Sequence, residues 1–201
     1  MDSTCFHNNV IFTIGYAAFD VKEFIAALKT YKISAVTDVR SIPYSKFRAD
    51  YNREALAKIL RESGIQYVYM GDSLGARFDD KSVYVNGVVD FDLAEKLESF
   101  RNGIARLEVG AKKFVIAVMC AEKDPIDCHR SILISKVLSK KFDVYHIHGD
   151  ASIESHKKLE NRLEKMFGFD QAVLLGNTLS LAYRKQSKKI AYSEVEHDTR
   201  N

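Results

Sequence analysis

Short apolar runs alternate with segments of helical periodicity along most of the chain. Five runs are typical of buried strands: residues 10–14, 33–39, 65–70, 114–119 and 144–147. The segments between them carry apolar side chains every three or four positions, which predicts helices. Regular alternation of strand and helix is typical of a parallel sheet covered by helices. We therefore predict an α/β fold with a mostly parallel, five-stranded sheet and helices on both faces.

Polar residues mark where the predicted helices begin, near residues 21, 52, 93, 124 and 153. Asp20, followed by Glu23, forms a capping-box pattern at the first start. Asp124 and Pro125 supply an N-cap and a first-turn proline at the fourth, which we expect to run to about residue 139. Residues 71–90 form a long connection rich in Gly and Asp, and connections of that length are usually functional or mobile.

The hydrophobic pattern divides the chain into one domain and an appendage. We expect an α/β domain over residues 1–168 and a C-terminal extension over residues 169–201, where the periodicity weakens. This basic tail carries the run 184–189 and ends in a polar stretch, residues 193–201. We expect the extension to be partly disordered, because small polar residues at a chain end bury little surface.

Composition adds little to this picture beyond what it excludes. The 201 residues are 46% hydrophobic and 28% charged, which is ordinary for a globular protein. A net charge of +3 neither requires nor excludes nucleic acid as a partner. No apolar run approaches the roughly 18 residues of a membrane span, and the N-terminal sequence lacks a signal-peptide pattern. We expect a cytoplasmic protein with no membrane partner and, with only three cysteines, reduced thiols.

Reactive side chains gather where the predicted strands end. Ligands of open α/β sheets bind at the carboxyl ends of the strands. The candidate site residues there are Tyr16, Asp38, Arg40, Ser41, Cys120, Glu122, Cys128, His129 and Arg130. The only two prolines, Pro43 and Pro125, follow strands two and four. We therefore expect two stiffened loops facing one cleft, with strands two and four as near neighbours.

Cys120 is the strongest candidate for a reactive residue. A cysteine that leaves a buried strand just before a helix feels the positive end of the helix dipole, and nearby arginine favours its thiolate. Such a thiolate is a nucleophile. The alternative is that Cys120 is a small core residue, and Cys128 packs in the same way. If Cys120 is the nucleophile, it should alkylate faster than Cys128.

Arg40 and Arg130 are candidate anion ligands, because the guanidinium fork suits phosphate or carboxylate. The alternative is that either arginine forms an internal ion pair with Asp38 or Glu122. A charge at the edge of a buried strand needs a partner, so Asp38 should pair with an arginine in both cases. For Arg130 we expect the anion-binding role, in which removal of its side chain costs little stability.

A metal site is a third hypothesis, built on Cys120, Cys128 and His129 with His146 or His148. The spacing matches no common zinc pattern. In a helix, neighbouring side chains point about 100° apart, so Cys128 and His129 would diverge. We therefore expect no metal and no cofactor.

Several short motifs succeed one another along nearly the whole chain. They are Ile14-Gly15-Tyr16, Asp38-Val39-Arg40-Ser41-x-Pro43, NREAL from Asn52, Gly64-Ile65-x-Tyr67, Cys120-Ala121-Glu122, Cys128-His129-Arg130-Ser131, Ala182-Tyr183-Arg184 and Lys189-Ile190-Ala191-Tyr192. This combination resembles the uncharacterised family called domain of unknown function 488 (DUF488). The resemblance implies a fold and a site at these motifs, but no established reaction. One departure is Tyr16-Ala17-Ala18, where the family often has a His-Ser or His-Asn type of sequence after the glycine.

A weaker likeness concerns the order of two motifs. Asp38-Val39-Arg40 followed by Pro43, with a later strand-end cysteine, is similar to rhodanese domains and cysteine phosphatases. Those families hold an oxyanion between a nucleophilic cysteine and the following helix. Here nine residues separate Cys120 from Arg130, more than in the phosphatase loop, so this likeness is one of fold.

Two functions are compatible with these residues. The first is an enzyme, a cysteine-dependent transferase or hydrolase, acting on a small anionic substrate that is phosphorylated or nucleotide-like. In it Cys120 is the nucleophile, Glu122 or Asp38 the acid, base or orienting carboxylate, and Arg40 and Arg130 the anion clamp. The alternative is a non-catalytic protein that binds nucleic acid or a phosphorylated ligand through the same arginines and the basic run 184–189. The sequence gives no oligomeric state.

Overall fold

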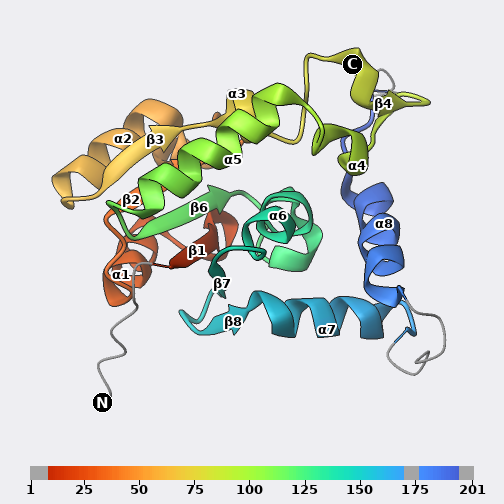
Figure 1. Ribbon diagram of the computed structural model, residues 1–201. Helices are drawn as coiled ribbons and strands as arrows, with labels where there is room; N and C mark the ends of the chain where they lie inside the picture. The colour runs from red at the N-terminus through yellow and green to blue at the C-terminus, as the bar shows by residue number, and fades with distance from the viewer. Residues whose placement is uncertain (1–8, 170–176, 195–201) are drawn as a thin grey trace.

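The computed structural model describes residues 9–169 and 177–194, and in them a six-stranded sheet forms the centre. The strand order is β3-β2-β6-β1-β7-β8 (Figure 1). The strands are β1 (Val10–Gly15), β2 (Ala35–Asp38), β3 (Gln66–Tyr69), β6 (Ile116–Cys120), β7 (Asp143–Ile147) and β8 (Ile153–Ser155). The first five run parallel and correspond to the five predicted strands. The predicted α/β architecture is confirmed.

Strands β2 and β6 are direct neighbours, as predicted from the two proline-containing loops. Asp38 lies opposite Met119 in the parallel register, and the Val39 amide donates to the Met119 carbonyl. Because β1 flanks β6 on its other side, the carboxyl ends of three neighbouring strands lie side by side at the centre of the sheet. Cys120 and Arg40 therefore lie on the same side of the molecule.

The sixth strand was missed by the sequence analysis. Residues 153–155, predicted to begin a helix, form β8 and pair antiparallel with β7, with Ile153 opposite Ile147. The helix α7 (His156–Met166) starts three residues later, where the Ser155 hydroxyl accepts the Lys158 amide. The apolar side chain of Ile153 was predicted to belong to the helical face, whereas it packs at the edge of the sheet.

Helices cover both faces of the sheet. Phe24 and Leu28 of α1 (Val21–Thr30) and Leu56 of α2 (Arg53–Glu62) pack on one face, against Phe12 of β1. The other face is covered by α5 (Glu98–Ala111), α6 (Lys136–Leu138), α7 and α8 (Thr178–Ile190). Ile11, the neighbour of Phe12, points to that second face, as expected for alternate strand positions.

The long connection and the predicted third helix are more subdivided than expected. The connection contains α3 (Gly71–Leu74) and a hairpin of β4 (Tyr84–Val85) and β5 (Val88–Val89). The third helix is split into α4 (Phe91–Ala94) and α5, because Leu97 adopts an extended conformation with ψ 139°. The hairpin stands at the side of the molecule, next to the end of α8 (Figure 1).

The predicted continuous helix over residues 124–139 is wrong. Asp124 does act as an N-cap, but only for a 3₁₀ turn over Pro125–Asp127. Cys128 is then extended, with φ −133° and ψ 139°. A π-helical segment (Arg130–Ser135) comes next, in which the Lys136 amide donates to the Ser131 carbonyl, before the short helix α6. This irregular stretch shapes the candidate site.

The basic run 184–189 lies within α8, which packs beside α7 (Figure 1). Tyr183 and Gln186 of this helix are buried. After the helix the chain joins the hairpin, because the Val89 amide donates to the Tyr192 carbonyl and Ser193 bridges to Val88. Residues 195–201, part of the stretch expected to be disordered, lie outside the described residues. In the described part, no helix is long and apolar enough to cross a membrane.

Candidate functional site

A cleft of about 350 Å³ opens at the carboxyl ends of β1, β2 and β6. Its lining residues are Tyr16, Arg40, Ser41, Ile42, Ala76, Arg77, Cys120, Ala121, Glu122, His129, Ile190 and Tyr192. A larger hollow of about 680 Å³ lies between the β4–β5 hairpin, α4 and α8, but no cysteine or histidine lines it. The smaller cleft is therefore the candidate site.

Four reactive side chains meet at the floor of this cleft: Cys120, Glu122, Cys128 and His129, here named the thiol cluster. His129 Nδ1 lies 3.7 Å from the Cys120 sulfur and 3.8 Å from the Cys128 sulfur. The Glu122 carboxylate lies 2.8 Å from the Cys128 sulfur. Both cysteines are buried, and Glu122 is exposed except for the carboxyl end that turns onto Cys128. All four residues were predicted as site residues from the sequence, and the structure brings them together.

The backbone around Gly15 and Cys128 makes this convergence possible. Gly15, at the end of β1, lets the Glu122 carbonyl approach so closely that a Cβ there would lie 1.8 Å from its oxygen. The extended conformation of Cys128 turns its sulfur toward the same space as the His129 ring. The expectation that Cys128 and His129 diverge is therefore wrong, since it assumed a helix at these positions.

The pKa values of the two cysteines in the cluster are shifted in opposite directions. The hydrogen bond to Cys128, together with burial, raises the pKa of Cys120 well above the ordinary range. Burial would also raise the pKa of Cys128, but the hydrogen bond from Cys120 and the charge of Arg130 hold it well below that range. These shifts favour the proton on Cys120 and the negative charge on Cys128. Cys128, rather than the expected Cys120, is the preferred place for the charge.

The other two groups of the cluster respond to that charge. Burial raises the pKa of the Glu122 carboxyl, and the negative Cys128 sulfur adds to the shift. Burial alone would lower the pKa of His129, but its hydrogen bond to Cys128 raises it above the ordinary range. Both shifts favour a proton on the groups that flank the sulfur pair.

Arg130 lies beneath the cluster, not in the cleft lining. Its side chain is completely buried and donates from Nη1 to the Glu122 carbonyl at 2.9 Å. Among the described residues no carboxylate pairs with it, and its Nε has no hydrogen-bond partner. Its amide donates to the Cys128 sulfur at 3.4 Å. The negative sulfur is therefore the nearest counter-charge for this buried cation.

Arg40 lies in the cleft wall, but its charge is already paired. Its Nε and Nη2 donate to the two Asp38 oxygens at 2.9 and 2.6 Å, and both residues are buried. Tyr67 also donates to Asp38, at 2.7 Å. The arginine–Asp38 pair that we expected is present, and the face of the Tyr16 ring lies 5.0 Å from the guanidinium.

Two of the cleft residues that were not selected from the sequence carry a charged or polar side chain. Arg77 is exposed, and its guanidinium lies 4.5 Å from the centre of the Tyr192 ring. Its amide donates to the Ser41 hydroxyl oxygen at 3.0 Å, which joins the loops after β2 and β3. Tyr192 belongs to the terminal motif Lys189-Ile190-Ala191-Tyr192 and Arg77 lies near the third strand end, so signals for both were present.

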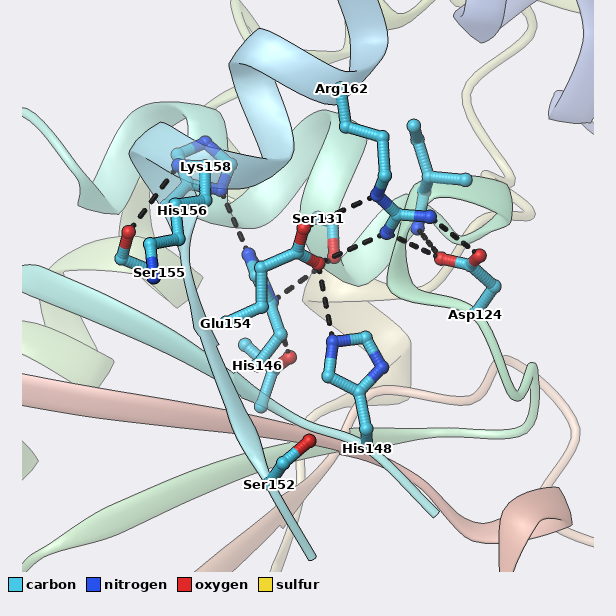
Figure 2. A network of polar contacts seen from close by, with 12 residues as sticks. Asp124, Ser131, His146, His148, Ser152, Glu154, Ser155, His156, Lys158 and Arg162 are labelled. Carbon is cyan, nitrogen blue, oxygen red and sulfur yellow. Dashed lines mark hydrogen bonds and ion pairs between the residues drawn. The ribbon is translucent and has the colours of Figure 1, made fainter. Parts of the chain in front are cut away.

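A second polar network supports the loop of the cluster from α7 (Figure 2). Arg162 donates to both Asp124 oxygens, at 2.7 and 2.8 Å, and to Glu154 of β8. Deeper in the core, His146 Nε2 lies 3.0 Å from His156 Nδ1 (Figure 2). His146 therefore belongs to this inner network and not to the thiol cluster.

Comparison with known proteins gives one match. The sequence model of a family described as "Domain of unknown function DUF488" matches residues 20–137, more than half of the chain. The matched range includes the thiol cluster and ends before α7 and α8. No curated protein and no solved structure gives a significant match. The likeness to rhodanese and phosphatase domains stays a prediction.

Proposed function

The chain belongs to the DUF488 family, and from its thiol cluster we propose an enzyme that acts on a small anionic substrate, phosphorylated or nucleotide-like, in the cleft. The single observation that carries this proposal is the contact of two buried cysteines with one histidine and one carboxylate at the cleft floor. Such a set offers a nucleophile, a base and an acid within contact of one another.

The cleft suits an anionic substrate of modest size. Its volume falls at the lower end of the roughly 300–1,000 Å³ typical of small-molecule sites. Arg77 offers a guanidinium at its rim, next to Tyr192. Arg40 is held by Asp38 and lends donors and a fixed wall rather than net charge. Arg130 adds positive potential from beneath the sulfur pair without touching the substrate.

Cys120 is the nucleophile in this proposal, because it lines the cleft whereas Cys128 does not. Its proton passes to the Cys128 sulfur. The Cys120 sulfur then bonds to the electrophilic phosphorus or carbon, and the leaving oxygen departs with its bonding electron pair. The Glu122 carboxyl gives that oxygen a proton. Water or another acceptor finally takes the transferred group and frees the sulfur.

The alternative, a nucleic-acid-binding protein, needs an open basic surface. The run 184–189 offers little, because Arg184 pairs with Asp92 and Lys189 lies 3.8 Å from Asp127. Lys185 lies 4.8 Å from the ring centre of Phe169. These contacts indicate that the basic residues hold α8 against the rest of the domain. The enzyme is therefore the better supported function.

The experiment is a turnover assay on the chelator-treated full chain, with p-nitrophenyl phosphate and adenosine 5′-monophosphate as probes. We expect Cys120→Ser to lower turnover by more than about 10²-fold, the scale of a lost catalytic group. Cys5→Ser, the matched control, should leave the rate unchanged. Turnover that is insensitive to Cys120→Ser, or no turnover of either probe, would overturn the proposal.

A further inference from the structure

We propose that Cys120, Cys128 and His129 form a binding site for a thiophilic divalent cation such as Zn²⁺, with its fourth coordination position facing the cleft. The ligand atoms are the two sulfurs and His129 Nδ1, which all lie within 4.8 Å of one another and are all buried. This goes beyond the proposed function, because it needs neither a substrate nor a covalent step.

The separations between the ligand atoms fit a tetrahedral ion. With Zn–S of about 2.3 Å and Zn–N of about 2.0–2.1 Å, a tetrahedral angle places sulfur and nitrogen about 3.6 Å apart. The observed distances from His129 Nδ1 are 3.7 Å to Cys120 and 3.8 Å to Cys128. The two sulfur–nitrogen separations therefore fit closely, while the two sulfurs lie within 4.8 Å of each other, against about 3.8 Å in a tetrahedral site.

Outer hydrogen bonds orient the ligands as metal sites require. His129 Nε2 lies 3.2 Å from the Val39 carbonyl oxygen, which can only accept, so Nε2 carries the proton. The lone pair of the neutral ring is then on Nδ1, facing the sulfurs. The Arg130 amide donates to the Cys128 sulfur, the type of bond that supports a thiolate ligand.

The buried charges balance once a divalent cation is present. Two thiolates neutralise the cation, and the remaining charges are those of Arg130 and Glu122, which are opposite. Without a cation the same pocket holds a buried arginine that no carboxylate pairs with in the described part of the chain. A buried charge needs such compensation, so the surroundings favour ionised sulfurs.

The fourth position opens to the cleft, because Cys120 and His129 line it. Three protein ligands and one open position are typical of catalytic rather than structural zinc sites. Glu122 is next to this position, and its carboxylate already contacts Cys128. Water or one oxygen of an anion would occupy the fourth position. A bound metal ion would also protect both sulfurs from alkylation.

The first test titrates the chelator-treated full chain with Co²⁺. We expect one equivalent to bind and to give the thiolate-to-cobalt charge transfer and strong visible absorption of a tetrahedral site. Cys120→Ser, Cys128→Ser and His129→Gln should each weaken binding by more than the roughly 10–100-fold that accompanies loss of an outer-shell partner. His148→Gln, a matched control outside the cluster, should bind like the wild type. Unchanged binding in the double variant Cys120→Ser/Cys128→Ser would overturn the site.

A second test avoids variants that fail to fold. X-ray absorption of the wild-type chain with one equivalent of Zn²⁺ should give two sulfur neighbours at about 2.3 Å. A shell of oxygen and nitrogen alone, or no stoichiometric binding, would overturn the proposal. If sulfur coordinates the metal but the protein shows no turnover, only the proposed thiol chemistry is contradicted. If the chelator-treated protein shows turnover but sulfur does not coordinate the metal, only the metal site is contradicted.

Discussion

The His129 ring donates from Nε2 to the Val39 carbonyl oxygen, 3.2 Å away, and so joins the loop after β6 to the end of β2. The bond fixes which ring nitrogen faces the two sulfurs. It also makes the geometry of the thiol cluster depend on the pairing of β2 with β6. The chemistry of this site is therefore held by the centre of the sheet and not by a free loop.

The opposite pKa shifts of the two cysteines lead to the first prediction. Cys120 should alkylate faster than Cys128 because Cys120 lines the cleft, whereas Cys128 does not and its sulfur is held by Glu122. Cys128→Ser should speed alkylation of Cys120 at pH 7, because Cys128 raises the pKa of Cys120, and each pKa unit removed increases the thiolate fraction about tenfold. Mass mapping after brief iodoacetamide treatment at two pH values measures both rates. Equal, slow labelling of both thiols would instead make Cys120 a core residue.

The Arg130→Ala variant should have a clearly lower free energy of unfolding than the wild type. This contrasts with the small loss of stability expected from the sequence. The side chain is completely buried, and its removal leaves a negative sulfur without its cation. We expect a loss of roughly 3–5 kcal/mol, as for a broken buried pair. Urea unfolding measures it, with Arg101→Ala, on the exposed side of α5, as the control. A small loss together with weaker phosphate binding would instead mean that Arg130 contacts the anion.

Arg77→Ala should weaken anion binding and leave the stability of the protein nearly unchanged. The side chain is exposed, so stability should change by less than about 0.5 kcal/mol. Binding of inorganic phosphate should weaken by about 1.5–3 kcal/mol, the scale of a hydrogen bond to a charged group. Thermal melts with and without phosphate separate the two effects, and Arg61→Ala on α2 is the matched control. Unchanged stabilisation by phosphate would remove Arg77 from the site.

His156 should make the protein sensitive to acid. Burial lowers its pKa to about 4, and the neighbouring buried His146 is shifted in the same direction. Below an unfolded value of about 6.5 the unfolded chain binds more protons, so stability falls as the pH drops from 6.5 toward 4. The slope per histidine is at most about 1.4 kcal/mol per pH unit.

His156→Gln should flatten that slope. The buried chain runs from Thr13 through His146 and His156 to Tyr183, which donates to Glu160, and all its members are satisfied with both histidines neutral. Glutamine keeps a donor and an acceptor but does not titrate. Urea unfolding at pH 7, 6 and 5 compares the two proteins, and parallel curves would contradict the assignment.

Gly15→Ala tests the close approach that shapes the cluster. The added methyl would lie 1.8 Å from the Glu122 carbonyl oxygen, a backbone atom that cannot move without its loop. We expect a loss of about 1–3 kcal/mol or more, together with slower alkylation of Cys120. Gly110→Ala is the control, because its methyl would meet only the flexible end of Ile116, at 3.2 Å. Full stability of Gly15→Ala would show that the loop moves freely.

The sequence predicted those parts of the fold that depend on regular periodicity. The five parallel strands and the contact of β2 with β6 could be inferred because apolar runs and paired loops are local signals. β8 was missed because three residues are too few for a pattern, and Ile153 also matched the helical spacing of the next residues.

The site was predicted by residue type but not by geometry. Cys120, Glu122, Cys128 and His129 all stood at strand ends, so position alone selected them. Their convergence depends on the extended conformation of Cys128 and on the π-helical segment, which no propensity indicates. The burial of Arg130 could not be inferred either, because an arginine at a predicted helix start is usually solvated.

The π-helical segment Arg130–Ser135 also limits how this gene can vary. A π turn holds one residue more than an α turn, so an in-frame deletion of one codon here would restore ordinary helical winding. Because the wider turn takes up the extra residue, the segments on either side would keep their direction, and the sheet and the downstream helices would tolerate such an allele. Cys128 and His129, which directly precede the segment, would lose the backbone geometry that places them beside Cys120. Lineages that lose the codon should keep the scaffold and lose selection on the two cysteines.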